Sequence, residues 1–351
     1  MAGGSWNPTS LPTRPGLYIN FVTAAAAQIK GGERGTVAIP LKAFTGGTAA
    51  AKTFYTVTNE TDAAALFGSA NIQSIKFALQ GGAKEVLVYT LPVSAVAQDY
   101  TDARTAFDTR PFNVFVFDGE VAASEQDAVK TWTATNKADG KHFMSVYGCV
   151  ATADDQTPAT GNARSVRLAD DYSVNLMSGV TIGGVSYSSG KFAPYIAGLI
   201  AWTPINRSIT FSPLGFVTDV TKRLTNTETK AALAAGSLVL THDGEKVKVE
   251  QGLTCSVKKI RAIRARQAVS TDVTKTASDS YIGQIDNNRD GQAALISAVK
   301  AYLETLEVAN VLTGPAVILD PQYASVGDSV YLAISYVEVD SMERIFLTIN
   351  V

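Results

Sequence analysis

The sequence predicts a layered α/β main domain followed by a smaller α+β domain at the C-terminal end. Between residues 35 and 150, continuous apolar strands alternate with helical segments, a pattern typical of a sheet covered by helices on both faces. From Lys258 the pattern changes to long helices followed by strands. We therefore expect an extended N-terminal arm (1–22), an α/β body domain (23–258) and a C-terminal domain (259–351).

The composition indicates a folded chain that carries few charges. Of 351 residues, 46% are hydrophobic and 18% are charged, and the net charge is −2. A balance this close to neutral argues against broad binding to nucleic acid or to an anionic membrane surface. The longest nearly uncharged apolar run, 192–202, is too short to span a bilayer, so we expect no membrane insertion.

Two further features concern the cellular compartment. The N-terminus shows neither the basic region nor the apolar region of a secretory signal. Only Cys149 and Cys255 are present, far apart and without a spacing pattern, so no disulfide framework follows. We expect the protein to fold in a reducing cytoplasm.

The first 16 residues are rich in Gly, Ser and Pro, and their three prolines fix φ and remove backbone donors. This composition predicts an arm rather than a packed element. The arm leads into a strand-like stretch in which Leu17, Ile19 and Phe21 occupy alternate positions. Fully extended, 22 residues reach roughly 70 Å, which exceeds the width of one domain. A loose leader before an ordinary first core strand would give the same pattern.

The body domain is expected to alternate strands and helices. The apolar runs predict strands at 35–40, 53–58, 86–89, 112–117, 143–150 and 174–176. Apolar spacing predicts helices at 72–79 (ended by Gly81 and Gly82), 101–108, 192–200 and 227–235, and one that Ser124 caps together with Asp127.

Two hairpins are expected in the second half of the body domain. Val180–Ile182 and Val185–Tyr187 flank Gly183-Gly184. The stretches 237–242 and 245–250 flank Asp243-Gly244, a strong signal for a two-residue hairpin loop.

The C-terminal domain begins with two long helices, at 271–285 and from Gly291, followed by strands at 316–319 and 329–339. The second helix carries an apolar face, formed by Leu295, Val299, Tyr302, Leu303 and Leu306.

The last ten residues show the two-residue period of a strand with one apolar face. Ile345, Leu347, Ile349 and Val351 alternate with Arg344, Phe346, Thr348 and Asn350. A terminal strand is easily lent to a neighbouring chain, because nothing beyond it has to be threaded through the pairing. On the pattern alone, a strand docked on its own domain is the more common case.

A cluster of basic residues lies within nine positions at the domain boundary: Lys258, Lys259, Arg261, Arg264 and Arg266. No aromatic residues interleave with them, so the cluster does not favour nucleic-acid binding. A patch that forms salt bridges with an acidic protein surface suits an acidic chain better.

Motifs for catalysis or for metal binding are weak. His142 and His242 have no metal-ligand spacing. The stretch from Gly184 to Lys191 resembles a phosphate-binding loop, but it is one residue too long and Phe192 replaces the hydroxyl residue. Asp286–Gly291 resembles the start of a calcium loop, yet Ser297 stands where the bidentate Glu belongs. We therefore interpret the latter stretch as a polar turn with Asp290 at a helix N-terminus, and we expect no enzyme, no catalytic residue, no metal and no cofactor.

Several stretches, taken in order along the chain, carry a resemblance to a known family. They are Pro15–Ile19, Gly81–Tyr89, Ala197–Ala201, Lys246–Gly252, Tyr281–Asn288 with Gly291, and Val339–Ile349. Together they resemble the tail sheath proteins of contractile phage tails and of related bacteriocin particles. The stretches are diffuse individually, but they are spread over nearly the whole chain.

The resemblance implies a structural role in a homo-oligomer. Sheath subunits stack as rings around an inner tube protein, between baseplate and tail terminator proteins, and contraction drives the tube through a target cell envelope without a nucleotide. The terminal segments of one subunit join a sheet of a neighbour. On this chain the exchange residues would be Leu17, Ile19, Phe21, Ile345, Phe346, Leu347, Ile349 and Val351.

The resemblance also implies a location and a role for the basic cluster. The protein would be made in the bacterial cytoplasm and end in a virion or an extracellular particle. The basic cluster would be a candidate patch facing the tube or another subunit. Longer family members carry an extra β-rich domain after the stretch equivalent to 86–91, which is missing here, so any role of that domain is in doubt.

Two other functions remain open at this point. A monomeric α/β ligand-binding protein or hydrolase would pair its terminal strands within one subunit. An inner tube protein is disfavoured, because tube subunits are usually much shorter and mostly β.

Overall fold

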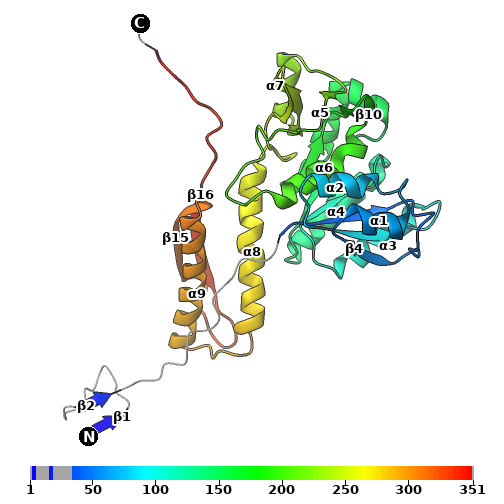
Figure 1. Cartoon of the computed structure of the whole chain (residues 1–351). Coiled ribbons are helices and arrows are strands. Elements are labelled where there is room, and N and C mark those ends of the chain that lie inside the picture. The colour runs from blue at the N-terminus through cyan, green and yellow to red at the C-terminus, as the bar shows by residue number, and fades with distance from the viewer. Residues whose placement is uncertain (1, 5–15, 19–33, 350–351) are drawn as a thin grey trace. The chain divides into compact units, whose positions relative to one another are not determined.

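The computed structural model describes residues 2–4, 16–18 and 34–349, and its contacts divide the chain into two compact units (Figure 1). The body unit comprises Gly31–Thr271 and Glu338–Val351. The small unit comprises Met1–Lys30 and Asp272–Val337. The two units therefore divide inside a helix, beyond the boundary expected near residue 258, and the C-terminal segment groups with the body unit.

The body unit is built on a seven-stranded sheet of order β12-β8-β7-β6-β3-β5-β4. Every neighbouring pair is parallel except β4 and β5, which are antiparallel. The strands are β3 (Thr36–Leu41), β4 (Phe54–Val57), β5 (Glu85–Thr90), β6 (Val114–Val116), β7 (Met144–Tyr147), β8 (Ser173–Leu176) and β12 (Ser237–Leu238).

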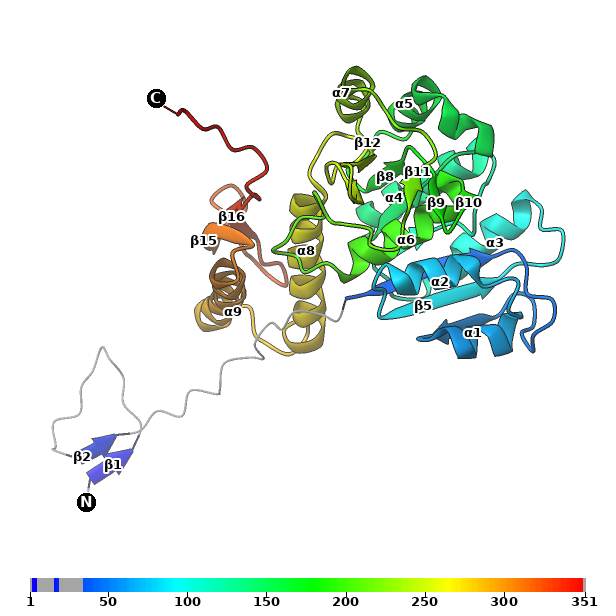
Figure 2. The same cartoon turned by 45° about the horizontal axis from the view of Figure 1, so that its top comes forward.

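Helices cover this sheet on both faces, as the sequence predicts (Figure 2). The helices of the body unit are α1 (Glu60–Phe67), α2 (Gln73–Gln80), α3 (Ala97–Asp108), α4 (Ala123–Ala138), the 3-10 helix η1 (Thr152–Gln156), α5 (Pro158–Arg167), α6 (Ser189–Trp202), α7 (Asn226–Ala234) and the first part of α8 (Ile260–Ser280). Along β3, Val37 and Ile39 join a core with α2 and α6, whereas Ala38 joins a second core with α3 and α4. This alternation follows from the two-residue period of a strand.

Helices α2 and α6 cross at glycines. A Cβ atom on Gly198 would lie 2.1 Å from the carbonyl oxygen of Ala78, and one on Gly81 would lie 2.2 Å from the carbonyl oxygen of Tyr195. The two backbones can approach this closely only because both residues lack a side chain. The motifs Gly81-Gly82 and Ala197–Ala201 therefore have a packing role.

Smaller sheets complete the body unit. The predicted hairpin at 180–187 is confirmed: β9 (Val180–Ile182) pairs antiparallel with β10 (Val185–Tyr187) and with β11 (Asp219–Val220). The second predicted hairpin also forms, from β13 (Leu240–His242) and β14 (Val247–Val249). Its loop has four residues rather than two, because the Asp243 side chain accepts hydrogen bonds from the backbone N–H groups of Glu245 and Lys246.

One predicted helix start is wrong. Ser124 lies inside α4 rather than at its cap, and the N-cap residue is Ala122, which offers no side-chain acceptor. The helix itself is confirmed, with Val129 fully buried and Trp132 packed against the aromatic core.

The small unit consists of the second part of α8, helix α9 (Arg289–Val308) and the two-stranded sheet of β15 (Leu312–Leu319) and β16 (Leu332–Glu338). Four residues of the predicted apolar face of α9 are buried, namely Val299, Tyr302, Leu303 and Leu306, and Leu295 is half-buried. The Tyr302 hydroxyl donates a 2.5 Å hydrogen bond to the buried Asp272 carboxylate, which ties α9 to α8.

Near the N-terminus, β1 (Ala2–Gly4) pairs in parallel with β2 (Gly16–Tyr18). Of the predicted exchange residues there, Leu17 lies in β2, whereas Ile19 and Phe21 lie outside the described residues. None of the described helices is long and apolar enough to cross a membrane.

Candidate functional site: the C-terminal arm

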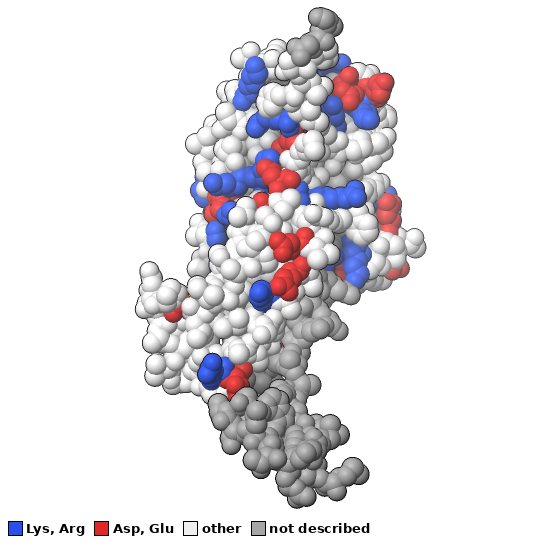
Figure 3. All heavy atoms as spheres, turned by 90° about the vertical axis from the view of Figure 1, so that its left-hand side faces the viewer, with Lys and Arg blue, Asp and Glu red and all other residues white. Residues whose placement is uncertain are grey.

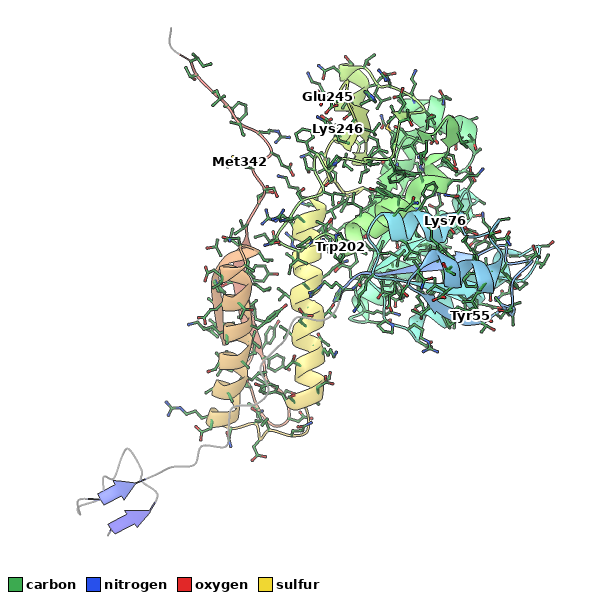
Figure 4. All side chains as sticks on the ribbon, viewed as in Figure 1. Tyr55, Lys76, Trp202, Glu245, Lys246 and Met342 are labelled. Atoms are coloured by element: carbon green, nitrogen blue, oxygen red, sulfur yellow. The ribbon has the colours of Figure 1, made fainter. Side chains whose placement is uncertain are left out.

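The large apolar side chains of the C-terminal segment are exposed to solvent. Ile345 is 68% exposed, Leu347 is 81% exposed and Ile349 is 79% exposed. From Val339 to Ile349 the chain has no strand pairing among the described residues, and Figure 4 shows the stretch beyond Met342 as an extended ribbon without a neighbouring strand. Exposed apolar side chains in this number normally mark a surface that another molecule covers.

The start of this segment, by contrast, is fixed to the body unit. We call residues 338–343 the arm root and residues 344–351 the arm strand. The predicted exchange residue Val351 lies outside the described residues. Arg266 forms an ion pair with Glu338. Lys259 lies 2.6 Å from the Asp340 carboxylate, and Arg261 donates a 2.8 Å hydrogen bond to the Ser341 hydroxyl.

Glu343 lies at the end of the arm root in a polar pocket. Its Oε1 accepts hydrogen bonds from Thr210 Oγ1 at 2.8 Å and from Ser208 Oγ at 3.3 Å. Its Oε2 accepts one from Gln251 Nε2 at 2.8 Å and lies 3.2 Å from Lys259 Nζ. The Glu343 side chain is only 8% exposed, so this carboxylate is bound by four groups and largely removed from water. We call Ser208, Thr210, Gln251 and Lys259 the anchor pocket.

The charges of the anchor pocket support one another. Burial alone would raise the pKa of Glu343, but hydrogen bonds from Thr210, Gln251 and Lys259 outweigh it, and the pKa lies below its ordinary value. Burial opposes the charge of Lys259 too, yet its bonds to Asp340 and Glu343 raise the pKa of the ammonium group. The ion pair is therefore favoured over the neutral forms across the middle pH range.

The basic cluster that the sequence singles out is divided between several environments. Lys259 and Arg266 pair with the arm root. Arg261 and Arg264 are buried, at 7% and 8% exposure, and burial lowers the pKa of Arg264 to about 9. Lys258 is exposed. On the face shown in Figure 3, basic side chains lie beside acidic ones, and wide areas carry neither.

A second apolar surface lies in the small unit. The sheet of β15 and β16 has only two strands, so each strand has an edge without a partner strand among the described residues. Ile318 is 55% exposed, Tyr331 is 43% exposed and Val337 is 65% exposed. A two-stranded sheet with open edges and apolar side chains is a ready acceptor for additional strands.

Hydrogen bonds within the fold join two loops at the place in the sheet where α/β enzymes usually bind ligands. Strand order reverses at β3, between β5 and β6, and ligands typically bind at the carboxyl ends of the strands there. The Lys42 backbone N–H donates to Asp118 Oδ2 at 3.0 Å, and Lys42 Nζ donates to the Glu120 carbonyl at 3.0 Å. These groups join the loops after β3 and β6, so they do not form an exposed acid–base pair.

A hollow of about 300 Å³ lies beside η1 and β9, lined among others by Thr152, Asp155 and Asp219. The Asp155 carboxylate accepts 2.6 Å hydrogen bonds from the backbone N–H and the hydroxyl of Ser189. Asp219 forms an ion pair with Arg223. Both carboxylates of the hollow are thus engaged by neighbouring protein groups.

The other weak motifs have local structural roles. Asn288 caps α9 by accepting from the Gly291 N–H at 2.9 Å, and Asp290 lies in the first turn, as the polar-turn interpretation predicts. His142 bridges the Tyr172 hydroxyl (2.9 Å) and the Ser270 hydroxyl (2.7 Å). Among the described residues, no three His, Cys, Asp or Glu side chains group as metal ligands.

Comparison with known proteins gives three family models that match successive parts of the chain. They are the tail sheath protein Gp18 domain III N-terminal region (34–91), the phage tail sheath protein central domain (94–255) and the phage tail sheath C-terminal domain (254–351). The boundary between the last two models lies close to residue 258, where the sequence pattern changes.

Individual relatives agree with these models. The tail sheath protein of Clostridium phage phiCD119 is 22% identical over 306 residues, which cover 83% of this chain and 79% of that protein. The sheath tail protein of Desulfitobacterium hafniense matches with a TM-score of 0.71 at 17% identity, over 92% of this chain and 100% of that one. The helical sheath of the anti-feeding prophage in its contracted state matches with a TM-score of 0.74 at 15% identity, over 97% of this chain and 99% of that one. The structural matches confirm the layered α/β fold with a smaller C-terminal domain.

Proposed function

The chain belongs to the phage tail sheath protein family, and from this premise we propose that it is a structural subunit of a contractile sheath. Copies of it polymerise as stacked rings around an inner tube, and contraction of this assembly drives the tube through a target cell envelope. The energy resides in a metastable extended assembly, so the mechanism requires neither a catalytic site nor a cofactor.

The exposed arm strand is the observation that carries this proposal. In the single subunit, the apolar side chains along one face of this strand are 68% to 81% exposed and therefore contribute little burial energy to the fold. Added to the edge of the β15–β16 sheet of a neighbour, the strand would form main-chain hydrogen bonds, and its alternating face would fix the register. The N-terminal arm, which contains β2, is the second segment that we propose to be exchanged.

Such exchange suits a contracting assembly. A connection between two subunits that runs through an extended segment persists while the folded units move as near-rigid bodies. The sheet of a neighbour holds the arm strand, and the body unit holds the arm root. Subunits can therefore slide and rotate without losing their connection to one another.

The proposed partners follow from the same role. They are further copies of the chain, the inner tube protein, and the baseplate and tail terminator proteins at the two ends of the sheath. We place the mature protein in a virion or an extracellular phage-tail-like particle. The exposed end of the basic cluster, Lys258, is the proposed contact with the tube or with another subunit.

Electron microscopy of negatively stained, concentrated protein tests the proposal, with and without the inner tube of the particle. The full chain is compared with a version that ends at Arg344. This version loses residues 345–351 of the arm strand but keeps Glu343 in the anchor pocket. Because residues 345–349 are exposed, the truncated chain should keep the melting temperature of the full chain.

Rings or tubes from the full chain that are lost on truncation would support strand exchange and the sheath role. Single compact particles from both versions, also in the presence of the tube, would refute it. That result would favour the alternative function, a monomeric α/β ligand-binding protein or hydrolase.

A further inference from the structure

The anchor pocket is a built carboxylate-binding site whose purpose the family relationship does not explain. Two hydroxyls, one amide and one ammonium group converge on a single carboxylate, Glu343, at 2.8 to 3.3 Å. The Thr210 hydroxyl oxygen also accepts a 3.1 Å hydrogen bond from the Gly252 N–H, which fixes its orientation. An exposed surface ion pair would not need this number of donors.

The pocket collects residues from three separate parts of the body unit. Ser208 and Thr210 come from the loop after α6, Gln251 follows β14, and Lys259 immediately precedes α8. The sequence separation between Thr210 and Glu343 is 133 positions. The bound carboxylate thus joins three segments, and the pocket is incomplete without the C-terminal segment.

The polar contacts with the body unit end at this residue. The Glu343 side chain is 8% exposed although Met342 beside it is 83% exposed, and Ile345, two positions later, is 68% exposed. Before Glu343, residues Glu338, Asp340 and Ser341 all contact basic residues of the body unit. After it, the described residues of the arm strand, up to Ile349, make no hydrogen bond or ion pair with another described residue.

We infer that the anchor pocket receives the Glu343 carboxylate in order to set the point at which the donated strand leaves its own subunit. Glu343 is a positioning residue: it does not itself pair with the neighbour, but it fixes the origin and the length of the segment that does. This inference rests on the proposed function, because only a donated strand needs a defined origin.

The length of the arm gives the inference a physical consequence. The eight residues from 344 to 351 span about 26 Å when extended, at roughly 3.3 Å a residue. Release of residues 339–343, which follow β16, would add about 17 Å. The longer arm has a larger set of reachable positions, and its effective concentration at one acceptor edge falls accordingly.

The inference is tested first on the unassembled full chain, by trypsin cleavage after Arg344. A protease needs an extended and accessible segment on both sides of the bond, and a bound Glu343 prevents this. Glu343→Gln keeps the size of the side chain but removes its charge. We expect release of the peptide 345–351, measured by mass spectrometry, to become at least tenfold faster in this variant than in the unchanged chain.

Two sets of variants serve as controls. Glu304→Gln removes the carboxylate of an exposed ion pair with Lys300 on α9, and it should leave cleavage after Arg344 unchanged. Lys259→Met should accelerate the cleavage as well. The double variant Lys259→Met/Glu343→Gln should be cleaved less than the product of the two single effects predicts, because both changes break the same contact.

The second measurement is the protein concentration at which assemblies first appear. We expect Glu343→Gln to raise it at least fivefold, and Glu304→Gln to leave it unchanged. Unchanged cleavage in Glu343→Gln would overturn the inference, because the pocket would not hold the arm. Faster cleavage with an unchanged assembly threshold would also overturn it, because the origin of the strand would then not matter.

Failure of the proposed function would look different. In that case neither the full chain nor the version ending at Arg344 would assemble, also in the presence of the tube, whatever the cleavage rates of the Glu343 variant. The truncation therefore tests donation of the strand, and the Glu343 variant tests the control of its origin.

Discussion

The burial of Leu347 in the assembled sheath is the prediction with the clearest magnitude. Leu347 is 81% exposed in the single chain, so Leu347→Ala should leave the stability of the unassembled protein unchanged. In a donated strand the same side chain would be buried on the apolar face. Removing its outer carbons would then cost about 2 kcal/mol for each donated strand, since burial of a leucine side chain contributes roughly 1.5–3 kcal/mol.

A change of 1.4 kcal/mol corresponds to a factor of ten in an equilibrium constant, so we expect the critical concentration for assembly to rise by about 30-fold. Pelleting by ultracentrifugation over a concentration series measures this threshold, and a thermal melt of the dilute protein checks the fold. Thr348→Ala, on the other face of the same strand, is the matched control and should change the threshold less than threefold. An unchanged threshold for Leu347→Ala would show that this face is not buried in the assembly, and the argument from the exposed strand would fail.

Two further predictions concern the body unit. Gly198→Ala should lower the free energy of unfolding by about 2–3 kcal/mol in a denaturant titration, because the added carbon would lie 2.1 Å from the Ala78 carbonyl oxygen, where ordinary contacts begin at about 3.4 Å. The control Gly215→Ala places its carbon where no atom lies within 4 Å, and it should be nearly neutral. Equal effects of the two substitutions would contradict the packing role of Gly198. Burial and the charge of Lys137 lower the pKa of His142 in the folded protein. The imidazole of the unfolded chain therefore binds a proton at a higher pH than that of the folded chain. The free energy of unfolding should consequently fall as the pH drops below about 6.5. His142→Asn should flatten that dependence between pH 5 and 7, and an unchanged slope would assign it to other groups.

Most of the fold could be predicted from periodicity and turn residues. The apolar runs place the strands of the large sheet within a few residues, and the Gly183-Gly184 hairpin is correct. The helix predicted at 271–285 has the wrong bounds, because α8 spans Ile260–Ser280. Two smaller errors concern a turn and a helix cap. Asp243 hydrogen-bonds two backbone N–H groups and widens its turn to four residues. Helix α4 starts one residue before the hydroxyl expected to cap it, because Ser124 is already helical.

The candidate site could be predicted only in part. The alternation from Ile345 to Val351 identifies the arm strand, because period two is a local property of the sequence. The arm root could not be found in this way. Glu343 binds Thr210 and Gln251, at separations of 133 and 92 positions, and a charge pattern does not reveal which distant group neutralises it. The one available signal was the resemblance of Val339–Ile349 to the sheath family, which marked the stretch without explaining Glu343.

The structure changes how the role of the basic cluster has to be tested. Reversal of all five charges would break the ion pairs of Lys259 and Arg266 with the arm root, so lost assembly would not by itself indicate a contact with the tube. Single reversals separate the two effects. Lys259→Glu should accelerate trypsin cleavage after Arg344 and prevent assembly, because it places a carboxylate beside Glu343 and Asp340.

Lys258→Glu is the reversal that tests the outer contact. The Lys258 side chain is exposed and has no ion pair among the residues that the structure describes, so the arm root should stay intact and cleavage after Arg344 should stay slow. If Lys258 meets an acidic surface on the tube or on another subunit, assembly around the tube should weaken and should weaken further at low salt, where repulsion between like charges is least screened. Normal assembly and contraction of Lys258→Glu would exclude this contact and leave the arm root as the main role of the cluster.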